Sequence, residues 1–170
     1  SHSPFNTMTA AATAAQANQA IYVHQGSPTG ATVLKANQTL WGAGAAFTLN
    51  GLTIAATIAP TLQSTVTLAD GVLVNSLSVN GNGVAAITGA GLSAIETLNA
   101  VSITGGTSGL ELSNVGGTIT VTGGAWTGVT AGSEVLVTGG TGTLNIGAAI
   151  VNSGSRSIDI QGKTGGTVTF

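Results

Sequence analysis

The chain has 170 residues, of which only 5% are charged, with three basic and five acidic side chains and no cysteine. So few basic residues cannot neutralise a phosphate backbone, which excludes nucleic-acid binding, and the lack of cysteine removes disulfides, thiolate zinc sites and thiol nucleophiles. No apolar run approaches the ~20 residues of a membrane-spanning helix, so we expect no membrane span.

The N-terminal residues differ from the rest of the chain. Residues 1–8 are expected to be a tag remnant or linker, because the opening SHS is typical of a vector scar. Residues 9–20 (TAAATAAQANQA) are rich in alanine and lack glycine and proline, which predicts a helix with Thr7 or Thr9 as its N-cap. A helix this short needs packing to persist, so we expect it to cap the open end of the first coil.

Residues 21–65 are expected to form irregular first coils. Strand-like runs occur at 21–23 (IYV) and 39–41 (TLW), and their spacing does not follow a fixed period. Trp41 could stack on a sugar ring or belong to the core, and the sequence leaves both open. His24 has no carboxylate near it in sequence, which favours a surface or capping role over general-base chemistry.

From residue 66 to residue 170 the apolar residues return to the same phase every 23 to 25 residues. The first column contains Val74, Leu98, Val121, Ile146 and Phe170, the second Leu77, Val101, Trp126 and Ile150, and the third the pairs Ala85/Ile87, Leu110/Leu112, Val135/Val137 and Ile158/Ile160. Each column lies in short runs that alternate apolar and polar residues, as strands with one buried face do. One coil cannot bury its apolar face alone, so the repeat indicates a solenoid. The sequence predicts a single all-β domain over 1–170, a parallel β-helix with three strands per coil.

Several segments, taken in order, carry a resemblance to a known family. They are the helix, IYVHQG at 21–26, TVLKANQTLWGAG at 32–44, TLADGVLVNSLSV at 67–79 and the regular coils of 66–170. Their order resembles the pectin-lyase-like superfamily, and most closely its non-catalytic members, which occur as repeat segments of large bacterial secreted and cell-surface proteins.

The resemblance carries expectations about structure and function. It implies a right-handed, single-stranded parallel β-helix, an extracellular or bacterial cell-surface location, and a structural or adhesive function whose partner is a polysaccharide or a host or cell surface. It also implies an asparagine ladder at one corner, through Asn80 and Asn152 but interrupted by Thr104 and Thr130.

Three acidic residues form a candidate catalytic cluster. Enzymes of the resembled family use clustered carboxylates, so a polysaccharide-acting enzyme and a carbohydrate-binding module stay open as alternatives. Glu111, Glu134 and Asp159 are predicted to face outward from the third column, where diagonal neighbours lie roughly 7 to 8 Å apart, within the window of about 5 to 9.5 Å for glycosidase carboxylates. The same charges also keep a strand face solvated and unpaired. No histidine or metal-ligand triad accompanies them, so we expect no metal or cofactor and favour a non-catalytic role.

A threonine array predicts a second candidate surface. If the first column points inward, six polar residues of three successive coils point outward: Thr118, Thr120, Thr143, Asn145, Thr167 and Thr169. A flat grid of this kind resembles the face of ice-binding β-solenoids, which makes ice binding a further alternative. Threonine also favours exposed strands in general, so the array fits an ordinary strand surface as well.

Two residues test whether apolar and polar side chains alternate strictly along these strands. Trp126 falls in the second column and is predicted to belong to the core. Glu96 would point inward by strict alternation from Leu98, but burying a carboxylate is costly. We therefore expect a bulge that turns Ile95 inward in its place.

The last residues, 167–170 (TVTF), stop within a first-column strand and have no capping helix. A solenoid end left open exposes unpaired backbone groups and an apolar core. We therefore expect the coils to continue beyond the C-terminus in a longer protein, and the isolated chain to self-associate end to end through this coil.

Overall fold

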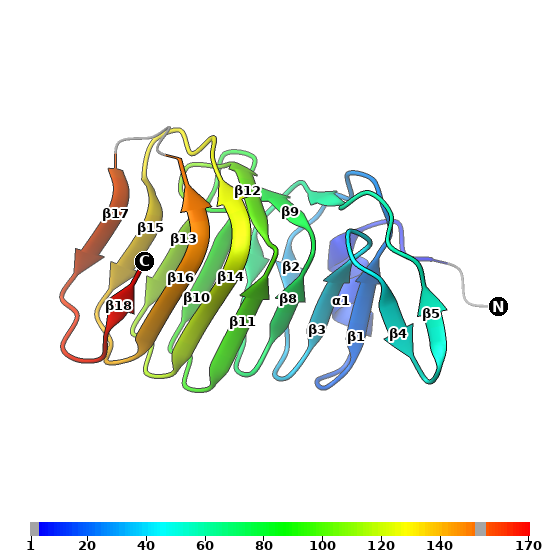
Figure 1. Ribbon diagram of the computed structural model, residues 1–170, viewed down its shortest axis with the longest axis horizontal. Helices are drawn as coiled ribbons and strands as arrows, with labels where there is room; N and C mark the ends of the chain where they lie inside the picture. Colours follow the sequence, from blue (N-terminus) through cyan, green and yellow to red (C-terminus); the bar gives the residue numbers. More distant parts are fainter. Residues whose placement is uncertain (1–3, 152–155) are drawn as a thin grey trace.

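The computed structural model describes residues 4–151 and 156–170 and shows an all-β chain, a parallel β-solenoid of about four turns (Figure 1). Within these residues one helix is present, α1 (Met8–Ala14). The strands are β1 (Ala20–Val23), β2 (Thr32–Val33), β3 (Thr39–Gly42), β4 (Phe47–Leu49), β5 (Leu52–Ile54), β6 (Thr61–Leu62), β7 (Val66–Thr67), β8 (Leu73–Asn75), β9 (Ser78–Asn80), β10 (Ile87–Ala90), β11 (Ile95–Asn99), β12 (Ser102–Gly105), β13 (Leu110–Ser113), β14 (Thr118–Trp126), β15 (Ser133–Thr138), β16 (Thr143–Ile150), β17 (Arg156–Gln161) and β18 (Val168–Thr169). The predicted all-β solenoid is confirmed.

Two parallel sheets run along the solenoid. The first has ten strands and contains two runs of pairing, β1-β3-β8-β11-β14-β16-β18 and β6-β9-β12-β14, which meet in the nine-residue strand β14. The second has the order β17-β15-β13-β10-β7-β2. Strands pair with their counterparts in the neighbouring coils (Figure 1), except that β4 and β5 form an antiparallel hairpin of their own.

The strand register confirms the first predicted column over four coils. Val74 pairs with Leu98, Leu98 with Val121, and Val121 with Ile146. All four side chains are buried. They face the core together because successive side chains of a strand point to opposite faces, and the parallel register keeps that phase from coil to coil.

The second column is shifted by two residues from the predicted alignment. Trp126 pairs with Ile103, which pairs with Val79, and not with Val101. Val79, Ile103 and Trp126 each follow the first-column residue of their coil by five positions, as Trp126 follows Val121, so no residue is inserted at this corner in these coils. Val101, which the count placed in the column, is a second buried apolar residue two positions before Ile103. Trp126 is nevertheless fully buried, as predicted, and its indole N–H donates to the Val101 carbonyl at 3.0 Å.

The third column is shifted at its first coil. Leu110 pairs with Ile87 and Leu112 with Gly89, so Ala85 lies outside the column where the sequence predicted it. A glycine is invisible to a count of apolar residues, and its missing side chain is replaced by Leu92, whose Cδ1 lies 2.7 Å from where a Cβ of Gly89 would stand. The following pairs at 135/137 and 158/160 align as predicted.

The N-terminal helix is shorter than the predicted 9–20. Thr7 is its N-cap, as expected, and accepts the Ala10 N–H at 3.2 Å. The helix ends at Ala14 because the following backbone finds partners elsewhere: the Gln38 amide donates to the Gln16 carbonyl at 2.8 Å. Its side chains Met8, Ala11 and Ala12 are buried in the same apolar cluster as the coils.

The expected asparagine ladder is not seen at Asn80. This residue lies opposite Gly105 and its side chain accepts the backbone N–H of Asn82 at 2.9 Å; Asn152 lies outside the described residues. Asparagines instead stack between β8 and β11, where the Asn99 amide donates to Asn75 at 2.6 Å.

Candidate functional site

Glu111 and Asp159 lie in one row of the second sheet but not in adjacent strands. Glu111 pairs with Leu136, and Leu136 pairs with Asp159. Two strand spacings place their backbones roughly 10 Å apart, at the upper limit of the spacing of glycosidase carboxylates. Asp159 is also engaged, because its Oδ2 accepts hydrogen bonds from Arg156 at 2.7 Å and Gln161 at 3.0 Å. This arrangement suits a solvated strand face better than acid–base chemistry.

Glu134 does not face outward, contrary to the prediction. Its side chain is fully buried, and its neighbours Ser133 and Val135 are buried too, so β15 begins without alternation. The cause is the corner from which β15 starts, where the coils touch through their backbones: a Cβ at Gly109 would collide with the Glu134 carbonyl. Glu134 therefore does not share a surface with Glu111.

A shallow groove of about 210 Å³ surrounds Glu111 on the outer face of the second sheet. Most of its other lining residues are small and uncharged: Thr67, Thr88, Gly89, Ala90, Ser113 and Thr138. Glu111 is the one acidic residue in this lining. A single carboxylate among hydroxyls can hydrogen-bond a polar ligand, but it lacks the second acid or base that hydrolysis requires.

Glu96 points into the core, so the predicted bulge at Ile95 is wrong. The Glu96 side chain is fully buried while Ile95 is 66% exposed, and Glu96 pairs with the buried Ile119. Its Oε1 accepts the N–H of Gly71 at 3.1 Å. Burial raises the pKa of Glu96; the Gly71 hydrogen bond opposes that rise, and the charge of Asp70 adds to it. The hydrogen bond makes the buried carboxyl tolerable without any break in the strand.

Asp70 joins the same corner to the next coil. It accepts hydrogen bonds from the Ser93 backbone N–H at 2.7 Å, the Ser93 hydroxyl at 2.9 Å and the Ala94 N–H at 3.3 Å. The bonds from Ser93 hold the pKa of Asp70 below its usual value. Asp70 and Glu96 therefore bridge two successive coils at one corner, and their pKa values are displaced in opposite directions.

The threonine array is aligned as its spacing predicts. Parallel pairing places Thr118 beside Thr143, Thr120 beside Asn145, and Asn145 beside Thr169. These side chains and that of Thr167 are partly or fully exposed. The coil before them presents Ile95 opposite Thr118, so an exposed apolar residue limits the array on that side.

Aromatic residues cluster on the outer face near the N-terminal end. Tyr22 and Trp41 are paired across β1 and β3, and the Phe47 ring lies 5.5 Å from each of their rings. Trp41 is half-buried, with its indole N–H donating to the Ala45 carbonyl at 3.2 Å, and is thus neither core nor a free sugar platform. The cluster fixes the start of the β4–β5 hairpin to the solenoid.

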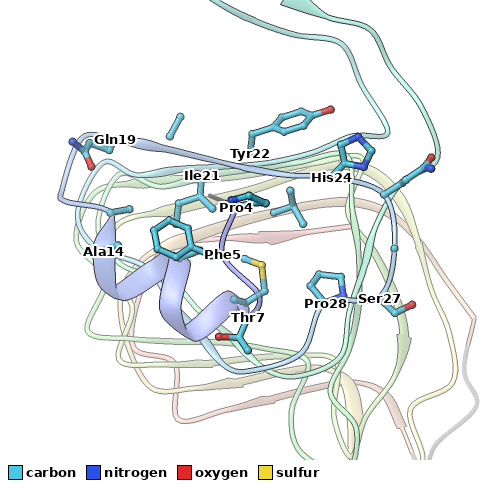
Figure 2. Close-up of a pocket in the computed structure, with 17 residues that line it drawn as sticks. Pro4, Phe5, Thr7, Ala14, Gln19, Ile21, Tyr22, His24, Ser27 and Pro28 are labelled. Atoms are coloured by element: carbon cyan, nitrogen blue, oxygen red, sulfur yellow. The ribbon is translucent and has the colours of Figure 1, made fainter. Parts of the chain in front are cut away.

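A cavity of about 960 Å³ opens beside β1 at the same end, between α1, β1 and the loop at 24–28 (Figure 2). Phe5, Met8 and Ile21 contribute apolar surface, and Gln19 and His24 contribute polar groups. Sequence reasoning missed this cavity because it arises from packing between elements. Its one sequence signal was a phenylalanine within residues assigned to a linker.

Within residues 4–151 and 156–170, no three His, Cys, Asp or Glu side chains are grouped so as to hold a metal ion. In the same part of the chain, no helix is long and apolar enough to cross a bilayer. No protein-family model, curated protein or solved structure matches the chain.

Proposed function

We propose that the chain is a non-catalytic structural or adhesive segment of a bacterial secreted or cell-surface protein. The observation that carries this proposal is the parallel ladder from β1 to β18, whose inward side chains are buried in the interior coils. In such a solenoid each coil contacts only its neighbours, so the fold spaces whatever it carries along one axis. The nearly uncharged outer faces suit contact with a neutral polymer or cell surface rather than a charged one.

The proposal includes a right-handed coil with three strands per turn, capped by α1. Two runs of pairing in the first sheet and one in the second support three strands per turn. The buried side chains of α1 support the cap. The right hand, bacterial origin and extracellular location rest on the resemblance of the sequence order to non-catalytic members of the pectin-lyase-like superfamily.

Depolymerisation assays test this function. The chain is incubated with acidic and neutral polysaccharides, and new chain ends are measured; we expect none. Turnover that is lost in Glu111→Gln or Glu134→Gln, and kept in the control Thr104→Ser, would favour the enzyme alternative instead. Binding on a glycan array without turnover would narrow the adhesive role to that of a carbohydrate-binding module.

Ice binding is a second candidate, favoured by the register that aligns Thr118 with Thr143 and Thr120 with Asn145. Its test is thermal hysteresis of the chain in freezing solution. Ice shaping that is lost in Thr120→Tyr but kept in Thr138→Tyr, an exposed threonine of the second sheet, supports this candidate. Ice growth indistinguishable from a buffer control removes it.

A further inference from the structure

The hairpin of residues 47–54, here called the arm, has one apolar face. The pairs Phe47/Ile54 and Leu49/Leu52 lie on that face, because directly opposed residues of an antiparallel pair share a side. Thr48 and Thr53 lie on the other, with their hydroxyl oxygens 2.8 Å apart. The turn Asn50-Gly51, with φ angles of 51° and 81°, is the preferred two-residue hairpin connection.

The start of the arm is fixed, but most of its apolar face is uncovered. Phe47 packs on Tyr22 and Trp41, whereas Leu49 is 56% and Leu52 72% exposed. Figure 1 shows the arm beside β1, on the side away from β3. The apolar face therefore extends over a position next to β1 at which the described residues place no strand.

The edge of β1 borders the same position. Within the described residues β1 pairs with β3 alone, so one row of its backbone groups has no strand partner. The cavity beside β1 is lined by apolar residues such as Phe5 and Ile21 and by polar residues such as Gln19 and His24. A strand added along β1 would thus place its outward side chains under the arm and its inward side chains over the cavity, the usual geometry of β-augmentation.

We propose that the arm, the β1 edge and the cavity form a slot for one parallel β-strand, and that its occupant is residues 167–170 of a second copy of this chain. The inference rests on the proposed structural function and names a contact through which copies of this chain would assemble. Strand β18 pairs only with β16 among the described strands, and β1 and β18 are the two ends of one ladder in the first sheet. Docking β18 on β1 therefore continues that ladder in the same parallel direction.

The side chains of residues 167–170 match the slot. Val168 pairs with the buried Leu144 and so shares its inward direction, and Phe170, two residues later, is 54% exposed. Both would enter the cavity, while the methyl groups of Thr167 and Thr169 would lie under the arm. The side chains of residues 20–23, 47–54 and 167–170 are uncharged, so docking buries no side-chain charge from these segments. The contact joins two different surfaces, which predicts linear assemblies.

Sedimentation velocity over a hundredfold range of concentration tests the slot. We expect the chain to form assemblies that lengthen with concentration. Leu52→Lys in the arm and Val168→Lys in the strand should each weaken association at least tenfold. The matched control is Ile95→Lys, which charges an equally exposed apolar residue in the middle of the rod and should leave association unchanged. Thermal unfolding of each variant checks that it is folded.

Mixing the two variants separates this contact from other modes of association. The Leu52→Lys variant keeps its strand and the Val168→Lys variant keeps its slot, so together they should form heterodimers that do not grow further. A monomeric wild-type chain at every concentration would overturn the inference. So would a Leu52→Lys variant that associates as well as wild type, since that outcome indicates contact between two C-terminal ends. Polysaccharide turnover would overturn the proposed function without affecting these results.

Discussion

The same column of side chains is buried in the interior coils and exposed in the last described one. Leu112 and Val137 are each 2% exposed, whereas Ile160, which pairs with Val137, is 42% exposed. Their chemistry is alike, and the difference is the number of adjacent coils: β13 has a strand on each side, whereas β17 pairs with β15 alone among the described strands. Burial in this solenoid is thus supplied by the neighbouring coils more than by the coil that carries the residue.

Truncating one residue of this column in an interior coil and one in the last described coil should give the largest difference in unfolding free energy. Leu112→Ala should lower the free energy of unfolding by about 2 to 5 kcal/mol, because it leaves a cavity between two coils. Ile160→Ala should lower it by about 1 kcal/mol or less, because its site is already partly hydrated. Urea denaturation measures both. Equal losses would show that the last coil is covered in solution, and the comparison would no longer hold.

The regular coils were predictable because their apolar period is nearly constant. Counting failed where a glycine replaced an apolar residue, as at Gly89, and where two buried apolar residues stand two positions apart, as Val101 and Ile103 do. At Gly89 the missing side chain is replaced by a neighbour, Leu92, and a count of apolar residues cannot tell which of two inward residues pairs with the next coil. The strand register, rather than the count, decides which residues share a column.

Glu96 tests the effect of burial by neighbouring coils on an ionisable group, because its side chain lies at an interior, covered position. Its folded-state pKa is raised, so its contribution to stability is complete below the usual glutamate pKa of 4.5 and is lost as pH rises through the folded-state pKa. Glu96→Gln keeps an oxygen for the Gly71 N–H and cannot ionise. Relative to wild type, the unfolding free energy of this variant should therefore increase between acid and neutral pH, because only the wild-type side chain has to ionise.

The measurement for Glu96 is the difference in unfolding free energy between wild type and variant at several pH values. Thr97→Ser, at the adjacent outward position of β11, serves as the control and should show no such trend. A difference that does not change with pH would mean that Glu96 is already solvated in the folded chain, against its full burial.

Asp70 should show the opposite pH dependence at the same corner. Its folded-state pKa is lowered, so its stabilisation is present above the usual aspartate pKa of 3.8 and is lost as pH falls through the folded-state pKa. Asp70→Asn should make the unfolding free energy depend less on pH in the acid range. At neutral pH the variant should lose only a smaller amount of stability, because an amide is a weaker hydrogen-bond acceptor than a carboxylate. Acid unfolding followed by circular dichroism measures this, and an unchanged acid limb would contradict it.

The candidate sites were less predictable than the coils. Strict alternation gave the outward direction of Glu111, but it failed for Glu134, because alternation holds inside a strand and not at the corner where one begins. The arm did have a signal in the sequence, since Asn50-Gly51 stands between two alternating apolar runs. A search for a fixed coil period treats such an insertion as irregularity. The cavity beside β1 depends on how α1 packs, and its one sequence signal, Phe5, lies among residues expected to be a tag remnant or linker.

Glu111→Gln should have the smallest effect, although Glu111 is the residue directly before Leu112. Its side chain lies on the outer face of covered coils, between Thr88 and Leu136 in the adjacent strands, and the substitution preserves its size. Unfolding free energy should change by about 0.5 kcal/mol or less. One step along β13 thus turns a loss of several kcal/mol into one near the limit of measurement, because the side chain changes from the covered face to the open one. A loss as large as that of Leu112→Ala would show that the carboxylate is held by a partner on this face, and the groove around it would then become the first place to look for a ligand.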